Sequence, residues 1–92
     1  MKRFQWNEDK NNSLKAQEDR QISFEEIIEA IEIGNLLDII KHPNQEKYPD
    51  QKIFIVQAKA YVYCVPFVED ESTIFLKTII PSRKMKKKYL GS

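Results

Sequence analysis

The sequence predicts an α+β fold in which an antiparallel sheet of four to five strands packs against helices. Two patterns predict this class. Apolar residues recur at helical spacing after residue 23, and β-branched and aromatic residues fill three runs between residues 53 and 80. The length of 92 residues leaves room for a single domain, 1–92, and a hydrophobic content of 41% is enough for a small core.

The first part of the chain is expected to contain a strand and a surface helix. Polar and apolar side chains alternate over residues 2–6, which is typical of a short strand. Asn7 can cap a polar helix that runs to about Gln17. Glu18–Gln21 is expected to form the connection that follows.

A second helix with a clear apolar side is expected next. Ser23-Phe24-Glu25-Glu26 matches a capping box, in which the serine hydroxyl accepts from the Glu26 amide and the Glu26 side chain reaches back. Isoleucines then face one side and glutamates the other, and Gly34 is expected to end the helix.

The rest of the chain predicts a meander and a last helix. Pro66 requires a bulge or an unpaired amide position in its strand. Short separators between the last three strands favour hairpins. Ser82 can cap a basic helix that runs to about Leu90, so the order of elements is β-α-α-β-β-β-β-α. Strands are expected over residues 36–40, 53–57, 61–68 and 73–80, with a loop over residues 42–51.

The composition excludes several classes of protein. No apolar run approaches the ~18 residues of a membrane span, and the N-terminus has no signal-peptide stretch. The single cysteine, Cys64, cannot form an intramolecular disulfide, so we expect a protein of the reducing cytoplasm. One Cys and one His are too few for a structural zinc site, and no glycine-rich phosphate loop is present. We therefore expect neither a metal nor a cofactor.

Charge is distributed unevenly along the chain. Residues 1–50 hold seven Lys/Arg and eleven Asp/Glu, whereas residues 51–92 hold eight Lys/Arg and three Asp/Glu. We expect one basic surface suited to phosphate and one acidic surface suited to a basic partner. The expected acidic surface is the row of glutamates on the second helix, which includes Glu25, Glu29 and Glu32.

The strongest local signal for function is the cluster of cations at the C-terminus. Arg83 is expected at the junction of strand and helix, where its guanidinium can hold a phosphate through two hydrogen bonds. At helical spacing Lys84 and Lys87 share one side, while Met85 and Tyr89 dock on the sheet. The alternative is a solvated helix whose lysines interact favourably with the helix dipole.

Three residues elsewhere are candidates for the same chemistry. His42 is expected in the loop after a strand and can act as a general acid or base, or is simply solvated. Lys52 begins a strand and Lys77 lies within one, and both can face a phosphate. Lysines at the edges of sheets also serve to prevent aggregation, which is the alternative for both.

Three blocks of the sequence resemble the BrnT family of toxins from bacterial type II toxin–antitoxin systems. The first block is Phe4-x-Trp6-x-x-Asp9-Lys10-Asn11, and the second is Ser23-Phe24-Glu25-Glu26. The third block, Ile79-Ile80-Pro81-Ser82-Arg83-Lys84-x-x-Lys87-x-Tyr89, is similar to the C-terminal segment of that family. The blocks occur in the family's order and frame almost the whole chain.

The resemblance implies a RelE-like fold and a metal-independent ribonuclease that arrests growth. It also implies a cognate antitoxin as partner, an RNA substrate that is free or bound to the ribosome, and contact with DNA only through the antitoxin complex. Carried over by position, Arg83 and Lys84 match the basic pair after the last strand, and Lys10 and Trp6 match the N-terminal lysine and aromatic residue.

We therefore expect attack of a ribose 2′-hydroxyl on the adjacent phosphate, with Arg83 stabilising charge in the transition state. His42, or a lysine of lowered pKa, would transfer protons, and Lys52 would position the phosphate. A non-catalytic nucleic-acid-binding or assembly module of the same fold is the alternative, and a protein whose lysines only confer solubility is another. The residues expected to bind RNA are Lys10, Lys77, Lys84, Lys87 and Tyr89.

Overall fold

The computed structural model describes residues 2–17 and 21–91. Their fold is α+β, as predicted. Most of the expected Glu18–Gln21 connection lies outside the described residues. The elements, in chain order, are β1 (Arg3–Trp6), α1 (Glu8–Lys15), α2 (Phe24–Glu32), β2 (Leu36–Lys41), β3 (Lys52–Ala58), β4 (Tyr61–Glu69), β5 (Thr73–Leu76), β6 (Ile80–Pro81) and α3 (Arg83–Leu90).

All three predicted helix caps are confirmed. The side chains of Asn7, Ser23 and Ser82 each accept a hydrogen bond from a backbone N–H in the first turn of their helix, at 3.0, 3.2 and 3.2 Å. Gly34 follows α2 with a φ of +94°, a conformation that side chains of L-residues rarely adopt. The sequence therefore determined where these helices begin and where α2 ends.

The described residues form an open six-stranded sheet in which β1, β5, β4, β3 and β2 are neighbours in that order. Strands β2 to β5 form the predicted antiparallel meander. The expectation of a purely antiparallel sheet of four to five strands is wrong, because β1 pairs with β5 in parallel. Strand β1 is separated from the meander by two helices, and alternation within a strand does not reveal its neighbour.

The predicted strand over residues 73–80 is interrupted. Strand β5 pairs with β4 as far as Leu76, and pairing with β4 resumes in β6 at Ile80, which lies opposite Cys64. Pro66 of β4 faces this gap: its carbonyl accepts from the Lys77 N–H at 2.8 Å, but its nitrogen has no hydrogen to donate. The pairing of β4 with β3 continues past Pro66 without a register shift, so the missing amide, rather than a bulge, accommodates the proline.

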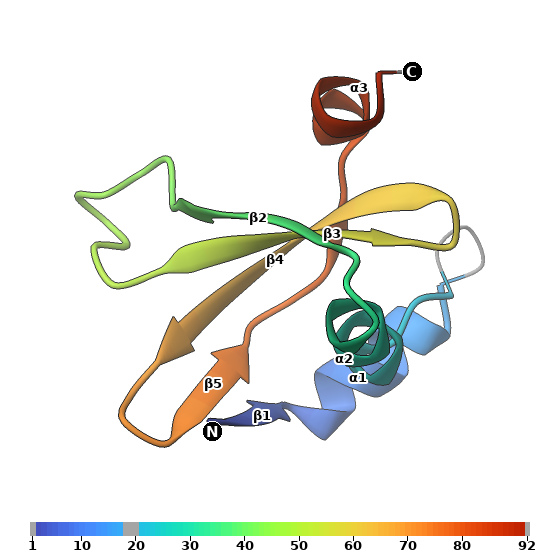
Figure 1. Ribbon diagram of the computed structural model, residues 1–92. Coiled ribbons are helices and arrows are strands. Elements are labelled where there is room, and N and C mark those ends of the chain that lie inside the picture. The colour runs from blue at the N-terminus through green and yellow to red at the C-terminus, as the bar shows by residue number, and fades with distance from the viewer. Residues whose placement is uncertain (1, 18–20, 92) are drawn as a thin grey trace.

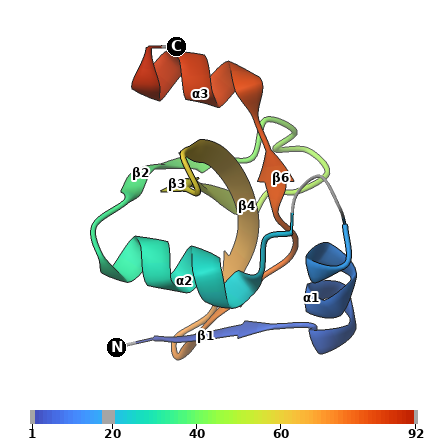
Figure 2. The same cartoon turned by 90° about the vertical axis from the view of Figure 1, so that its right-hand side faces the viewer.

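Helices cover both faces of the sheet, as Figures 1 and 2 show. On one face α1 and α2 contribute Leu14, Phe24 and Ile27 to the larger core, which includes Phe54 and Phe67. Across the sheet, α3 packs over a smaller core. This core contains Ile53, Ile55 and Val62, with Leu37, Ile40, Cys64, Met85, Tyr89 and Leu90 packed around it. The two faces of the sheet therefore carry different helices and present different surfaces.

None of the helices in the described ranges is both long enough and apolar enough to span a membrane.

Candidate nucleic-acid interface

The solvent side of α3 gathers four cations. Met85, Lys86, Tyr89 and Leu90 are half-buried toward the sheet, whereas Arg83, Lys84, Lys87 and Lys88 are exposed. We call these four exposed residues the α3 basic face. They are spaced three and four residues apart, so their charges lie close together on the helix. Within residues 2–17 and 21–91, none of the four forms an ion pair.

Tyr89 holds the end of α3 on the sheet. Its hydroxyl donates to Asp38 Oδ2 at 2.6 Å. This hydrogen bond lowers the pKa of the Asp38 carboxyl and raises the pKa of the Tyr89 hydroxyl. Tyr89 was predicted to bind RNA and also to dock on the sheet, and the docking is what the structure shows.

A β-bulge brings Asp38 to this position. Leu36 pairs with Val56 and Asp38 pairs with Ile55, so Leu37 is the extra residue of β2. The bulge is needed because Leu37 and Asp38 both lie on the α3 side of the sheet. The signal in the sequence is a single carboxylate within the apolar run 36–40, which we did not single out.

Lys77 lies on the same side of the sheet as α3. It is exposed just after β5, and its ammonium is 5.6 Å from the centroid of the Phe75 ring. It precedes Arg83 by six residues, and the intervening chain passes along β4 as β6. The structure thus places four of the predicted RNA-binding or catalytic residues on one side of the molecule: Lys77, Arg83, Lys84 and Lys87.

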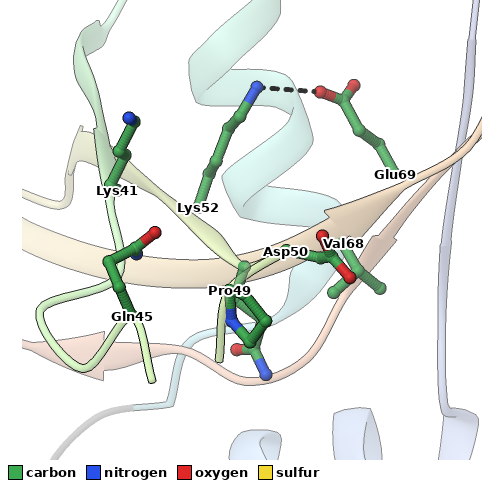
Figure 3. Close-up of a pocket in the computed structure, with 8 residues that line it drawn as sticks. Lys41, Gln45, Pro49, Asp50, Lys52, Val68 and Glu69 are labelled. Atoms are coloured by element: carbon green, nitrogen blue, oxygen red, sulfur yellow. Dashed lines mark hydrogen bonds and ion pairs between the residues drawn. The ribbon is translucent and has the colours of Figure 1, made fainter. Parts of the chain in front are cut away.

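Lys52 faces the other side of the sheet, in an open groove of about 520 Å³ that Figure 3 shows. Lys41 lies directly opposite Lys52 in the register, and Figure 3 shows the Glu69 side chain of β4 directed toward Lys52. The Glu69 carboxylate accepts from Lys2 at 2.8 Å and from Lys52 at 3.3 Å, which lowers the pKa of Glu69. Lys52 therefore already has an anionic partner in this fold.

His42 is held in an ordered loop. Its Nδ1 accepts from the Asn44 N–H at 3.0 Å, and its ring centroid is 4.5 Å from that of Tyr48. With Nδ1 accepting, the neutral ring carries its proton on Nε2. The His42 N–H pairs with the Gln51 carbonyl at 3.1 Å, so by alternation His42 lies on the face opposite to Lys41 and Lys52.

Arg83, His42 and Lys52 do not meet. Arg83 follows Ser82, whose N–H bonds to Val62 opposite Gln57 of β3. Lys52 is five residues from Gln57, or about 17 Å along the strand, and it faces away from α3. His42 pairs with Gln51, the residue before Lys52, and is therefore still further from Ser82 along the sheet. One phosphate therefore cannot contact all three side chains, and the catalytic roles of His42 and Lys52 remain predictions.

The acidic row lies on the face opposite to α3. Glu25, Glu29 and Glu32 are exposed along the outer side of α2. Glu25 accepts from Asn11 at 2.7 Å and lies 3.9 Å from the Lys15 ammonium. Lys10 is exposed on α1, on this same side of the sheet, away from the α3 basic face. The exposed glutamates of α2 and the α3 basic face thus lie on opposite sides of the sheet.

Asn11 has a structural role that its place in the Phe4–Asn11 block does not indicate. It is fully buried, and its Oδ1 accepts from the Phe24 N–H at 2.8 Å. It therefore joins α1 to the first turn of α2, and the signal was a polar residue at a core position of a helix.

The arrangement brings together exposed cations on one side of the molecule. In the part of the chain that the structure describes, no group of three or more His, Cys, Asp or Glu side chains is placed to hold a metal ion. The α3 basic face is the candidate site, since it joins an arginine to three lysines that form no ion pair among the described residues. The nearby Asp38 carboxylate accepts the hydrogen bond of Tyr89. No family model, curated protein or solved structure matches this chain.

Proposed function

We propose that this protein binds RNA through the α3 basic face and acts as a metal-independent ribonuclease toxin of a bacterial type II toxin–antitoxin system, with a RelE-like fold. The observation that supports RNA binding is the set of four exposed cations on α3 without an ion pair among the described residues. Such cations release the counterions of a phosphate backbone when they bind it.

Arg83 is the group that we assign to charge stabilisation. In the proposed reaction the 2′-oxygen bonds to the adjacent phosphorus and the 5′-oxygen leaves, which gives a cyclic phosphate and a 5′-hydroxyl end. The planar guanidinium of Arg83 can donate two hydrogen bonds to the phosphoryl oxygens as their charge grows. Lys84 and Lys87, on the same side of α3, hold the flanking phosphates.

One observation favours a second candidate, a non-catalytic RNA-binding module. Cleavage by 2′-hydroxyl attack needs a proton acceptor near the phosphate. His42 is displaced from the start of α3 by six residues along β3, or about 20 Å. A lysine beside Arg83 is the remaining acceptor among the predicted residues. The two candidates share the binding surface and differ in their products.

The partner in the proposal is a cognate antitoxin. Its surface on this chain is the exposed row of Glu25, Glu29 and Glu32, which suits a basic segment and lies across the sheet from the proposed RNA site. Contact with DNA would come through the antitoxin. A cytoplasmic location agrees with these partners.

The proposal is tested with single-stranded RNA and purified protein in excess EDTA. We expect wild type to yield cyclic-phosphate ends and Arg83→Ala to reduce the cleavage rate by about 100-fold or more. Lys47→Ala removes one positive charge from the β2–β3 loop and should cut at the wild-type rate. Equal cleavage by Arg83→Ala would contradict the role of Arg83.

Binding without cutting would support the second candidate. In that case RNA is retained with a log–log salt slope of about −3 for four phosphate contacts, and no new ends appear with or without ribosomes. Replacement of Lys84 or Lys87 by Gln should reduce the slope by about 0.7 each.

A further inference from the structure

The α3 side of the sheet has a part that α3 does not cover. Helix α3 packs on β2, β3 and the start of β4, through Met85, Tyr89 and Leu90. Figure 1 shows β1 and β5 well away from α3, with α1 and α2 on the other side of the sheet. We call the uncovered part the open sheet face. Six of its side chains carry the argument, namely Arg3, Gln5, Val68, Phe75, Lys77 and Ile80.

The pairing register places these residues on one face. Phe75 pairs with Val68 of β4 and with Gln5 of β1. Their neighbours along the strands, Phe67, Leu76 and Trp6, contact the larger core, so the alternate positions point to the α3 side. Phe75 belongs to neither core cluster, in contrast to Phe4 on the adjacent strand.

This face combines an aromatic ring with cations, and at its β1 edge Glu8 lines a shallow pocket with Gln5 and Phe75. Phe75 is half-buried, its ring is 5.6 Å from the Lys77 ammonium, and Arg3 is exposed two residues before Gln5. Ile80 is 45% exposed and connects this face to Arg83 through β6 and Ser82. A stacking ring beside cations is the arrangement by which sheets hold single-stranded nucleic acid.

We propose that the open sheet face binds the bases of single-stranded RNA, with Phe75 as the ring on which one base stacks. This proposal rests on the proposed RNA binding and adds a base-binding site to the phosphate-binding α3 basic face. The base replaces the Lys77 ammonium over the Phe75 ring, and the lysine then pairs with the adjoining phosphate.

The test compares two oligonucleotides of equal length and charge, a single-stranded RNA and its abasic counterpart. Base stacking predicts that wild type binds the RNA about tenfold or more tightly than the abasic chain. Phe75→Leu should lose most of that preference while its affinity for the abasic chain stays unchanged. Phe75→Tyr keeps a ring and should retain the preference. Tyr48→Leu, in the β2–β3 loop, is the matched control and should behave as wild type.

The outcomes separate this proposal from the one on which it rests. A full preference in folded Phe75→Leu, or its loss in Phe75→Tyr, overturns the stacking site and leaves RNA binding by α3 intact. Arg83→Ala should weaken binding of both chains by a similar factor, because it acts on phosphate. If wild type binds neither chain at low salt, RNA binding itself fails, and the stacking site fails with it.

Discussion

Asn11 shows how much a single polar side chain contributes to this small fold. It is fully buried, and it satisfies the backbone N–H of Phe24 while its amide donates to Glu25 and, at 3.3 Å, to Glu8. The bond from Asn11 is the main reason that the pKa of Glu25 is lowered. One residue therefore links two helices and stabilises an ionised carboxylate at the N-terminus of α2.

We expect Asn11→Ala to reduce the free energy of unfolding by about 1–3 kcal/mol, because the Phe24 N–H loses its buried partner. The pKa of Glu25 should rise toward its ordinary value. A carboxyl group with a lowered pKa stabilises the fold at every pH above its ordinary pKa. This stabilisation is lost as the pH falls through the lowered pKa of the folded state. In acid, the wild type should therefore lose the part of its free energy of unfolding that ionised Glu25 contributes. The variant lacks most of this contribution, so its stability should change less with pH.

Urea unfolding at neutral and acidic pH and an NMR titration of Glu25 measure both effects. Asn12→Ala is the matched control, since Asn12 is the exposed neighbour on the same helix. An unchanged unfolding midpoint in Asn11→Ala would show that the interhelical bond is dispensable.

At the scale of elements, α2 and α3 begin in the same way but are held differently. Both have a serine cap, with Ser23 and Ser82 accepting from a first-turn N–H at 3.2 Å. Helix α2 buries Phe24, Ile27 and Ala30, whereas α3 has no fully buried residue among its eight. The stability of α3 therefore depends more on its cap and on the Tyr89–Asp38 bond.

We expect the two cap variants to act on different measurements. Ser23→Ala should lower the global free energy of unfolding by about 1 kcal/mol, because α2 is part of the main core. Ser82→Ala should mainly increase amide hydrogen exchange in α3 and weaken RNA binding, since α3 can open locally while the sheet stays folded. Hydrogen exchange by mass spectrometry and urea unfolding distinguish the two. Equal effects on global stability would indicate that α3 unfolds only with the whole protein.

At the scale of the whole molecule, β1 connects the N-terminus to the far edge of the meander. It pairs only with β5 in the described part of the chain, and Trp6 stacks on Phe24 of α2 at 5.9 Å between centroids. Trp6 thus joins the edge strand to the helical layer.

We expect Trp6→Ala to reduce the free energy of unfolding by about 3 kcal/mol, at the lower end for a large aromatic residue because Trp6 is only half-buried. Gln5→Ala, at the exposed neighbouring position, should change it by less than about 0.5 kcal/mol. Urea unfolding followed by far-UV circular dichroism measures both. A small effect of Trp6→Ala would mean that β1 adds little to the stability of the sheet.

Local patterns predicted much of the fold because their causes are local. Helix caps at Ser23 and Ser82 and the left-handed residue Gly34 depend on hydrogen bonds and sterics within a few residues. The parallel pairing of β1 with β5 was not predicted, because the residues within a strand do not indicate which other strand it pairs with. The break after Leu76 was missed because its cause, Pro66, lies on the neighbouring strand.

The sequence by itself determined the α+β class, the helix starts and the row of cations on α3, since each follows from spacing and side-chain chemistry along one segment. Only the tertiary structure decided which of these residues meet. Arg83 and Lys77 come to one side of the sheet, while Lys52 turns to the other and pairs with Glu69. The physical reason is that the face of each strand residue depends on register and on bulges such as that at Leu37, which arise from pairing between distant segments.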